Sequence, residues 1–254
     1  MKVSLITVCY NAERYIDNAI QSVIDQSYED IEYILVDGNS TDATLSIIKK
    51  YENRISKIIS EPDKGIYDAM NKGVSHATGE VIGILNADDF YFDSNVIKDV
   101  VECFQSKETD TLYGDLVYVD PVDTKRVIRY WRSGEYNRSK FKYGWMLPHP
   151  TFFVKRHIYE KFGHFNLSLK TSADYEYMLR VLYKYRVSTQ YLPRVMTIMR
   201  TGGTSNASIT HRIRANSEDR KAWTVNDLKP GLFTRYLKPI RKLIQYTRKN
   251  KEVF

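Results

Sequence analysis

The stretch KVSLITVCYNAERYIDNAIQSVIDQSYEDIEYILVDGNS, residues 2–40, decides the fold. It opens with a β-rich apolar run that ends at Cys9. Apolar residues then recur at helical spacing from Ile16 to Ile24, and a second apolar run covers Ile31–Val36. A strand, a helix and a second strand in so short a stretch predict a βαβ unit, whose parallel strands are joined by a right-handed crossover.

The same alternation continues through about the first hundred residues. Further strands are expected at Ile55–Ser60 and Glu80–Leu85. Helical stripes lie between and after them, and Ser40 or Thr41, and later Ser94, are candidates for the helix caps. Strands that alternate with helices predict an α/β fold with a Rossmann-like, mostly parallel sheet flanked by helices.

Four polar clusters follow the four strand-like runs of this region. They are Tyr10-Asn11, Asp37-Gly38-Asn39-Ser40, Glu61-Pro62-Asp63-Lys64-Gly65 and Asn86-Ala87-Asp88-Asp89. In an open α/β sheet, ligands bind beyond the carboxyl ends of the strands. We therefore expect the four clusters to converge on one ligand-binding crevice.

The pattern changes after residue 110. Strand-like runs at 111–119, 126–131, 151–155 and 191–199 predict an antiparallel or mixed C-terminal extension of the sheet. Residues 133–150 form a long aromatic and basic connection, and connections of this length are typically functional or mobile. The expected organisation is one domain with two halves, residues 1–110 and 111–225, followed by a tail, residues 226–254.

The composition is that of an ordinary globular protein, with 43% hydrophobic and 27% charged residues. No run approaches the roughly 20 apolar residues that cross a bilayer, and the N-terminus lacks the features of a signal peptide. These features predict a cytoplasmic location. The two cysteines, Cys9 and Cys103, lie in apolar segments and are expected to be free buried thiols.

The net charge of +7 is concentrated in the tail. From Lys229 to the end there are eight Lys and Arg residues against one acid, Glu252, which gives +7, while the rest balances at 30 basic and 30 acidic residues. Such a basic, partly apolar tail is typical of contact with an anionic membrane surface. A solvated surface helix, or simple packing against the body, explains the same residues.

The adjacent acids Asp88 and Asp89 stand at a predicted strand end. Two neighbouring carboxylates are costly unless they are solvated or neutralised. A hard divalent cation with oxygen ligands neutralises them and can bridge a substrate diphosphate. An acidic turn that caps the helix after Ser94 is the alternative, and the cluster alone leaves both open.

Several short motifs occur in one order along the chain. They are Val8-Cys9-Tyr10-Asn11, then Val36–Asp42, Glu61–Gly73, Ala77–Glu80 and Leu85–Asp89. Each is weak alone, but the ordered set resembles the family-2 glycosyltransferases of the type that builds bacterial surface polysaccharides. The resemblance covers roughly residues 1–205. It implies a GT-A fold in which residues 1–110 bind a nucleotide sugar, and residues 111–225 bind the acceptor and carry catalysis.

The resemblance implies nucleotide-binding roles for residues of the first half. These residues are Tyr10, Asn11, Asp37, Asp63, Lys64, Asn71 and Asn86. Tyr10 would stack on the base, and Asp37 would accept a hydrogen bond from the base or ribose. Asp63 and Lys64 would lie beside the nucleoside, and Asn71 would face the donor from the next helix. For Asp37, capping of the following helix is the structural alternative.

The resemblance also implies a divalent metal, manganese or magnesium. Asp88 matches the last acid of the family's Asp-any-Asp signature, which holds the metal on the diphosphate. Asn86 stands where that signature has its first acid, so this chain departs from the pattern, although Asp89 adds a neighbouring carboxylate. His211 is a candidate third ligand.

Inversion at an anomeric carbon requires one base that deprotonates the attacking hydroxyl. Asp174 matches the family's catalytic acid at a predicted helix start, with Ala173 in place of a preceding acid. An acid at a helix N-terminus is also favoured structurally, and Glu176 is the rival base. The resemblance places His149 on the acceptor side and Arg200–Ser205 in a flexible loop near the donor phosphates.

The sequence therefore predicts an inverting glycosyltransferase. It would move a sugar from a nucleotide-diphosphate donor, expected to be UDP-linked, to a hydroxyl of a lipid-linked or cell-surface glycan, as in O-antigen or capsule synthesis. A peripheral position at the inner face of the plasma membrane is the location this implies. The alternatives are a non-catalytic nucleotide-sugar or glycan-binding protein and a nucleotidyltransferase, and no nucleic-acid-binding module is recognised.

Overall fold

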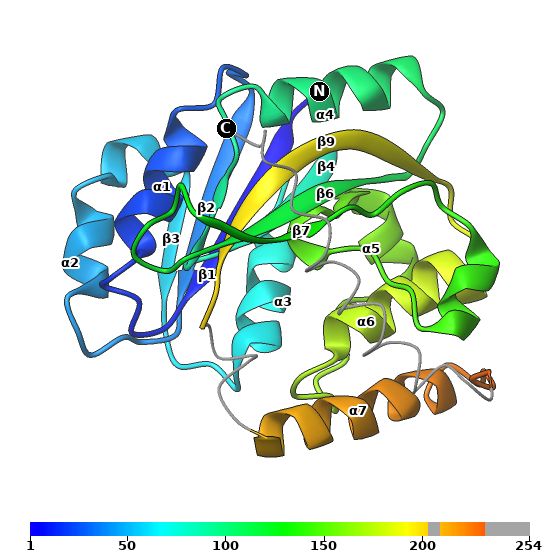
Figure 1. Cartoon of the computed structure of the whole chain (residues 1–254). Coiled ribbons are helices and arrows are strands. Elements are labelled where there is room, and N and C mark those ends of the chain that lie inside the picture. Colours follow the sequence, from blue (N-terminus) through cyan, green and yellow to red (C-terminus); the bar gives the residue numbers. More distant parts are fainter. Residues whose placement is uncertain (203–208, 232–254) are drawn as a thin grey trace.

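The computed structural model describes residues 1–202 and 209–231, with the backbone alone for residues 209–216. The described residues form a nine-stranded sheet with helices packed against it, as Figure 1 shows. The main strand order is β3-β2-β1-β4-β8-β6-β9-β5, and β7 pairs with β6. The predicted α/β class is confirmed.

The first half follows the predicted alternation of strands and helices. Its strands are β1 (Val3–Cys9), β2 (Ile31–Asp37), β3 (Lys57–Ser60) and β4 (Val81–Asn86), and its helices are α1 (Ile16–Ile24), α2 (Thr44–Lys49), η1 (Glu52–Arg54), α3 (Ile66–His76) and α4 (Val96–Ser106). The four strands run parallel, and β1 lies between β2 and β4 with every residue buried. This burial on both faces explains the continuous apolar run at the start of the sequence.

The register aligns the strand ends that were expected to meet. Cys9 pairs with Asp37, and Asp37 pairs in turn with Ser60. On the other side of β1, Val8 pairs with Asn86. The polar clusters that follow these four strands therefore leave the sheet at one edge, as predicted.

The second half is mixed. Its strands are β6 (Thr111–Val119), β7 (Val127–Trp131), β8 (Phe153–Lys155) and β9 (Thr189–Arg200), and its helices are η2 (Arg138–Tyr143), η3 (His149–Thr151), α5 (Arg156–Phe162), α6 (Ala173–Met178), η4 (Leu179–Lys184) and α7 (Ile209–Thr224). Strand β5 (Asp89–Tyr91) comes from the first half and pairs with β9. Strand β6 is antiparallel to β7 and β8 but parallel to β9, so the predicted mixed extension is confirmed. The sequence did not predict β5.

The connection formed by residues 133–150 packs into the core. Phe141 and Leu147 are fully buried, and Trp145 lies between other aromatic rings. The Trp145 indole also donates a hydrogen bond to the Ser133 carbonyl oxygen, 3.2 Å away. Of the two expectations for this connection, functional or mobile, the second is not met, because Phe141, Trp145 and Leu147 anchor it in the core.

Two predicted helix caps are also wrong. The N-cap positions are Ala43 for α2 and Asn95 for α4, and neither side chain caps its helix. The Ser40 hydroxyl instead donates to Asp37, and the Ser94 carbonyl accepts a hydrogen bond from the Ser27 amide at 2.7 Å. These residues join neighbouring loops rather than beginning helices.

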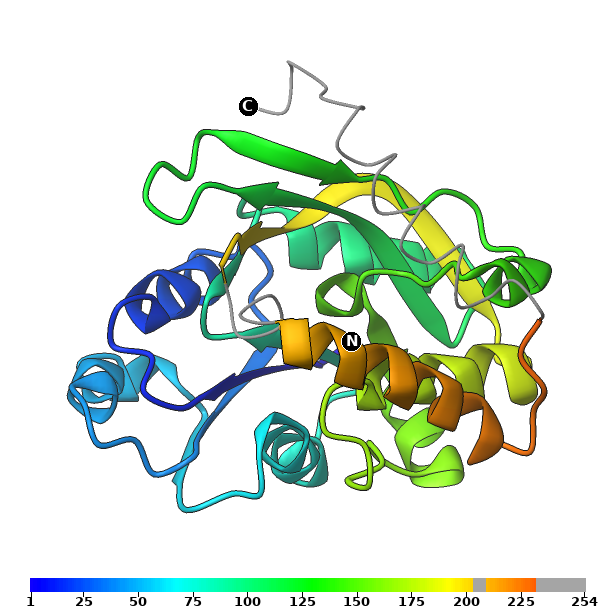
Figure 2. The ribbon, with the colours of Figure 1, turned by 60° about the horizontal axis from the view of Figure 1, so that its bottom comes forward.

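Helix α7 packs against α6, and Figure 2 shows it running across that part of the molecule. The Trp223 indole donates to the Tyr175 hydroxyl at 3.0 Å, and both rings are buried. Asn226, at the start of the expected tail, is also buried against this region, while residues 232–254 lie outside the described residues. No helix among the described residues has the length and apolar character needed to cross a membrane.

Candidate active site

Tyr10 and Asn11 form the turn after β1. The Tyr10 ring is 62% exposed and is available for stacking. Asn11 has a positive φ of 48° and links two loops, because its Oδ1 accepts a hydrogen bond from the Thr41 amide while its own amide donates to the Ser40 hydroxyl. These contacts make Asn11 a support for the turn that presents Tyr10, and its contact with a nucleotide stays a prediction.

Asp37 is fully buried at the end of β2. Its carboxylate accepts hydrogen bonds from the Ser40 amide and hydroxyl and from the Ser60 hydroxyl, the last at 2.7 Å. Cys9 pairs with Asp37 in the sheet, and burial, together with the smaller effect of the Asp37 charge, raises the pKa of the Cys9 thiol. The described contacts thus give Asp37 the role of joining three strand-end loops, and its direct contact with the base or ribose stays a prediction.

Asp63 approaches Gly38 closely at this edge. A Cβ atom on Gly38 would lie 2.3 Å from the Asp63 Oδ2, so the position tolerates no side chain without moving the carboxylate. The other oxygen, Oδ1, accepts a hydrogen bond from the Gly65 amide at 2.7 Å, immediately before α3. The Lys64 side chain beside it is exposed. Asp63 and Lys64 are therefore placed between the end of β2 and the start of α3.

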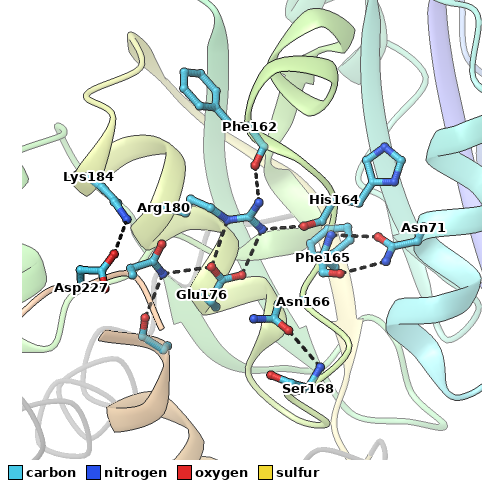
Figure 3. A network of polar contacts seen from close by, with 12 residues as sticks. Asn71, Phe162, His164, Phe165, Asn166, Ser168, Glu176, Arg180, Lys184 and Asp227 are labelled. Atoms are coloured by element: carbon cyan, nitrogen blue, oxygen red, sulfur yellow. Dashed lines mark hydrogen bonds and ion pairs between the residues drawn. The ribbon is translucent and has the colours of Figure 1, made fainter. Parts of the chain in front are cut away.

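Asn71 makes a two-point contact across the molecule, shown in Figure 3. Its Nδ2 donates to the Phe165 carbonyl oxygen, and its Oδ1 accepts from the Phe165 amide, both at 2.9 Å. Both polar ends of the side chain are thus occupied by the backbone. The described contacts join α3 to the second half, and the predicted contact of Asn71 with the donor stays a prediction.

The two acids after β4 lie in different environments. Asp88 is half-buried, and burial raises its pKa. Asp89 is fully buried in β5, and burial together with the nearby Asp88 charge raises its pKa well above the ordinary value. The Asn86 Nδ2 donates to the Asp89 Oδ2 at 2.9 Å. Asp88 is therefore the carboxylate of this pair that faces outward.

Arg200, at the end of β9, contacts the backbone of the turn that contains Asp88. Its guanidinium donates to the Asp88 carbonyl oxygen at 2.7 Å and to the Asn18 Oδ1 at 2.8 Å. It also lies over the Tyr15 and Phe90 rings, 4.9 and 4.7 Å from their centroids. Arg200 thereby fixes the backbone that carries Asp88. Residues 203–205 of the predicted phosphate loop lie outside the described residues.

The donor atoms near Asp88 fit a hard divalent cation. Asp88 supplies a half-buried carboxylate, and the buried Asn86 Oδ1 has no hydrogen-bond partner among the described residues. No group of three or more His, Cys, Asp or Glu side chains suited to a metal occurs among those residues. Oxygen ligands from a bound diphosphate would complete such a site. The predicted ligand His211 lies where only the backbone is described.

Asp174 occupies the first turn of α6, as expected, and is half-buried. The Tyr67 hydroxyl, from α3, donates to the Asp174 Oδ1 at 2.8 Å. His149 is also half-buried; burial lowers its pKa, and the Asp174 charge opposes this shift. The structure thus brings the predicted base and the predicted acceptor-side histidine into one electrostatic neighbourhood.

The rival base, Glu176, lies in a buried network drawn in Figure 3. Its carboxylate accepts hydrogen bonds from the Arg180 guanidinium at 3.0 and 3.1 Å and from the Asn226 amide at 2.9 Å. Arg180 also donates to the carbonyl oxygens of Phe162 and His164. Both Glu176 oxygens are therefore occupied inside the protein, which excludes Glu176 as an accessible base in this structure.

Tyr67 and Arg180 are the supporting residues that sequence reasoning missed. Tyr67 stands within a family motif but was given no role of its own. Tyr67 and Asn71 are four residues apart and therefore lie on one face of α3. This spacing is the sequence signal that both residues contact the same neighbour, which is Phe165. Arg180 stands four residues after Glu176, the spacing of an ion pair along a helix.

Comparison with known proteins identifies the family. The family model described as "Glycosyl transferase family 2" matches residues 4–163. A "PGL/p-HBAD biosynthesis glycosyltransferase" of Mycobacterium bovis is 29% identical over 210 residues, which cover 81% of this chain and 80% of the relative. An uncharacterized glycosyltransferase of Mycobacterium tuberculosis is 31% identical over 185 residues, which cover 70% of this chain and 68% of the relative.

Solved structures show the same fold. The structure of S. aureus TarS 1–349 in complex with UDP-GlcNAc matches with a TM-score of 0.69 and 19% identity, over 93% of this chain and 69% of that one. The mannosyltransferase PcManGT from Pyrobaculum calidifontis, in complex with GDP-Man and Mn²⁺, matches with a TM-score of 0.67 and 18% identity, over 96% and 69%. The GT-A fold is thereby confirmed, and the chain belongs to glycosyl transferase family 2.

Proposed function

We propose that this chain is an inverting glycosyltransferase that uses a nucleoside-diphosphate sugar, most simply a UDP-sugar. Similar structures hold UDP-GlcNAc, or GDP-Man with Mn²⁺, which supports a nucleotide-sugar donor. The exposed Tyr10 ring and the Asp63–Lys64 segment lie at the sheet edge where such a nucleotide would bind.

The observation that carries the mechanism is the environment of Asp174. It is a half-buried carboxylate held by one hydroxyl, whereas Glu176, two residues later, is buried and fully paired. Asp174 would take the proton of an acceptor hydroxyl as its oxygen attacks the anomeric carbon and the bond to the diphosphate breaks. One base implies a single displacement, and therefore inversion.

Asp88 would hold a divalent cation, manganese or magnesium, with the Asn86 Oδ1 as a further oxygen donor. When bound, the cation compensates the charge of the departing diphosphate. Arg200 would keep Asp88 in place through its backbone carbonyl oxygen. The site therefore joins a donor half that orients the diphosphate to an acceptor half that removes one proton.

The acceptor would be a hydroxyl of a lipid-linked or cell-surface glycan precursor, with His149 beside it. The mycobacterial relative is named as a biosynthesis glycosyltransferase, which supports an acceptor that is a precursor in a biosynthetic pathway. The half-buried His149 and Asp174 share one neighbourhood, where a hydroxyl could be both oriented and deprotonated. Binding of the basic tail to a membrane remains a proposal, because residues 232–254 lie outside the described residues.

Asp174→Asn tests the function. The substitution keeps the shape of the side chain but removes the base, so kcat should fall by about two to four orders of magnitude. Calorimetry should show unchanged binding of the nucleoside diphosphate. Asp123→Asn, which alters an exposed acid in the β6–β7 turn, is the control and should leave kcat unchanged.

The substrates come from a panel of nucleotide sugars assayed with manganese. Anomeric coupling constants of the product should show inverted configuration. Retention of configuration would reject the single displacement. Absence of transfer and of donor hydrolysis across the whole panel, with nucleotide binding intact, would instead indicate a non-catalytic binding protein.

A further inference from the structure

The candidate base makes a direct contact with the donor half of the molecule. The hydrogen bond from the Tyr67 hydroxyl to the Asp174 Oδ1, 2.8 Å long, joins α3 to α6 across 107 residues of sequence. Tyr67 is only 9% exposed, and its ring packs against Phe165 at a centroid distance of 5.8 Å. Asp174 accepts no other hydrogen bond from the described residues, so none of them holds its Oδ2.

A second contact fixes the same face of α3. Tyr67 and Asn71 are four residues apart and so lie one above the other on the helix. Asn71 holds the Phe165 backbone through two hydrogen bonds of 2.9 Å, beside the ring that packs on Tyr67. The contacts of Tyr67 and Asn71, one helical turn apart, therefore fix the position of α3 along its axis and its rotation relative to the segment that leads to α6.

The start of α3 also belongs to the donor edge. Asp63 and Lys64 directly precede the helix, and the Lys64 amide donates to the Asp68 carboxylate at 3.0 Å within the first turn. Tyr67 is thus about one helical turn from residues that we propose to lie beside the nucleoside. A shift of this turn would move the Tyr67 hydroxyl and, with it, the carboxylate that it holds.

The Tyr67 hydroxyl acts as a donor throughout the neutral pH range. Burial, and then the charge of Asp174, raise the pKa of Tyr67 well above its ordinary value. The phenol therefore stays protonated and donates to the carboxylate. A donor held by a rigid ring fixes the orientation of the carboxylate plane.

We propose that Tyr67 is a positioning residue for the base, orienting Asp174 so that its Oδ2 faces the acceptor hydroxyl and tying this orientation to the donor-binding turn. This inference rests on the proposed function, in which Asp174 is the base. The hydroxyl of Tyr67 acts through Asp174 and does not itself take the proton.

Tyr67→Phe removes the hydroxyl and keeps the ring that packs on Phe165. We expect kcat to fall by about ten- to a hundredfold, because the base loses its fixed orientation, while KM for the donor and the affinity for nucleoside diphosphate stay unchanged. Tyr51→Phe is a matched control, because the Tyr51 hydroxyl also donates to a carboxylate, that of Asp17, at 2.8 Å but between α1 and the end of α2. It should leave kcat unchanged.

The pH profile separates positioning from a general loss of structure. Among the described titratable side chains, Tyr67 of α3 donates a hydrogen bond to Asp174, and His149 of η3 is close enough to be influenced by the Asp174 charge. Removing a donor from a carboxylate disfavours its charged form, so the acid limb of kcat/KM in Tyr67→Phe should move to higher pH. The Tyr51→Phe limb should coincide with that of the wild type.

Combining the substitutions distinguishes the two proposals. In an Asp174→Asn background, Tyr67→Phe should add no further loss of kcat, because the base through which it acts is gone. If Asp174→Asn is inactive but Tyr67→Phe keeps the wild-type kcat and acid limb, the positioning role is wrong and the base assignment stands. If Asp174→Asn keeps its kcat, the proposed function fails first, whatever Tyr67→Phe does.

Discussion

Two close pairs of acids contain the candidate metal ligand and the candidate base, one pair at a sheet end and one on a helix, and they are stabilised differently. Asp88 and Asp89 follow β4, whereas Asp174 and Glu176 lie in the first turn of α6. In each pair the first acid is half-buried and the second is buried, fully for Asp89 and to 2% exposure for Glu176. Each pair therefore has one acid that is partly exposed and one that is buried.

The buried acids differ in their partners. Glu176 is paired with the Arg180 guanidinium and the Asn226 amide, so its charge is compensated within the fold. Asp89 receives one hydrogen bond from Asn86, and its Oδ1 has no partner among the described residues. The Glu176 carboxylate is thus fully paired, whereas Asp89 is influenced by the Arg200 charge but keeps one oxygen without a hydrogen-bond partner among the described residues, beside the position proposed for a cation.

Removing Glu176 should have the largest effect on stability. Glu176→Ala leaves the Arg180 guanidinium, whose side chain is only 15% exposed, without its carboxylate, and the loss of one partner of a buried pair costs about 3–5 kcal/mol of unfolding free energy. Urea denaturation followed by circular dichroism measures it. Glu160→Ala breaks the exposed Arg156–Glu160 pair, which also has a spacing of four residues, and should cost roughly 0–1 kcal/mol.

The milder Glu176→Gln variant keeps the test open if the alanine variant does not fold. It retains the packing but removes the charge, so its loss should lie between those of the two alanine variants. Equal losses for Glu176→Ala and Glu160→Ala would show that the buried network adds nothing beyond an exposed ion pair.

Removing Asp88 should have the next largest effect, this time on turnover. If Asp88 positions a divalent ion on the diphosphate, Asp88→Ala should lower kcat/KM by about a hundredfold or more. Excess chelator should abolish wild-type turnover, and manganese or magnesium should restore it. Full wild-type activity in chelator would remove the metal from the mechanism, and Asp123→Ala serves as the control for loss of an acid.

The edge of the sheet could be predicted from the sequence because its signals are local. Continuous apolar runs mark β1, β2 and β4, and each run ends in polar residues at the strand end. The bounds of β6, Thr111–Val119, are those expected from the sequence. Hydrophobic runs and the polar residues that end them are enough to predict these strands, because neither signal depends on distant residues.

The supporting contacts could not be predicted in the same way. Strand β5 spans only Asp89–Tyr91, too short for any period to show, and its pairing with β9 buries Asp89. The Tyr67 contact joins residues 107 positions apart, and the caps expected at Ser40 and Ser94 were wrong because loop partners compete for those residues. A single sequence indicates which residues have the chemistry but not which partners burial gives them.

The smallest effect, and the finest test of the comparison, concerns Asp89. Its pKa is raised in the folded protein, so the folded state holds the proton more tightly than the unfolded chain does. This contribution to stability is complete below the ordinary carboxyl pKa of about 3.9 and is lost as the pH rises through the folded-state value.

Asp89→Asn stays uncharged and can still accept the Asn86 hydrogen bond. In urea denaturation without metal, its stability relative to the wild type should therefore increase as the pH rises above about 4. Asp123→Asn should show no such trend. Parallel stability curves for Asp89→Asn and the wild type would mean that Asp89 is as well compensated as Glu176, and the contrast between the two pairs would be lost.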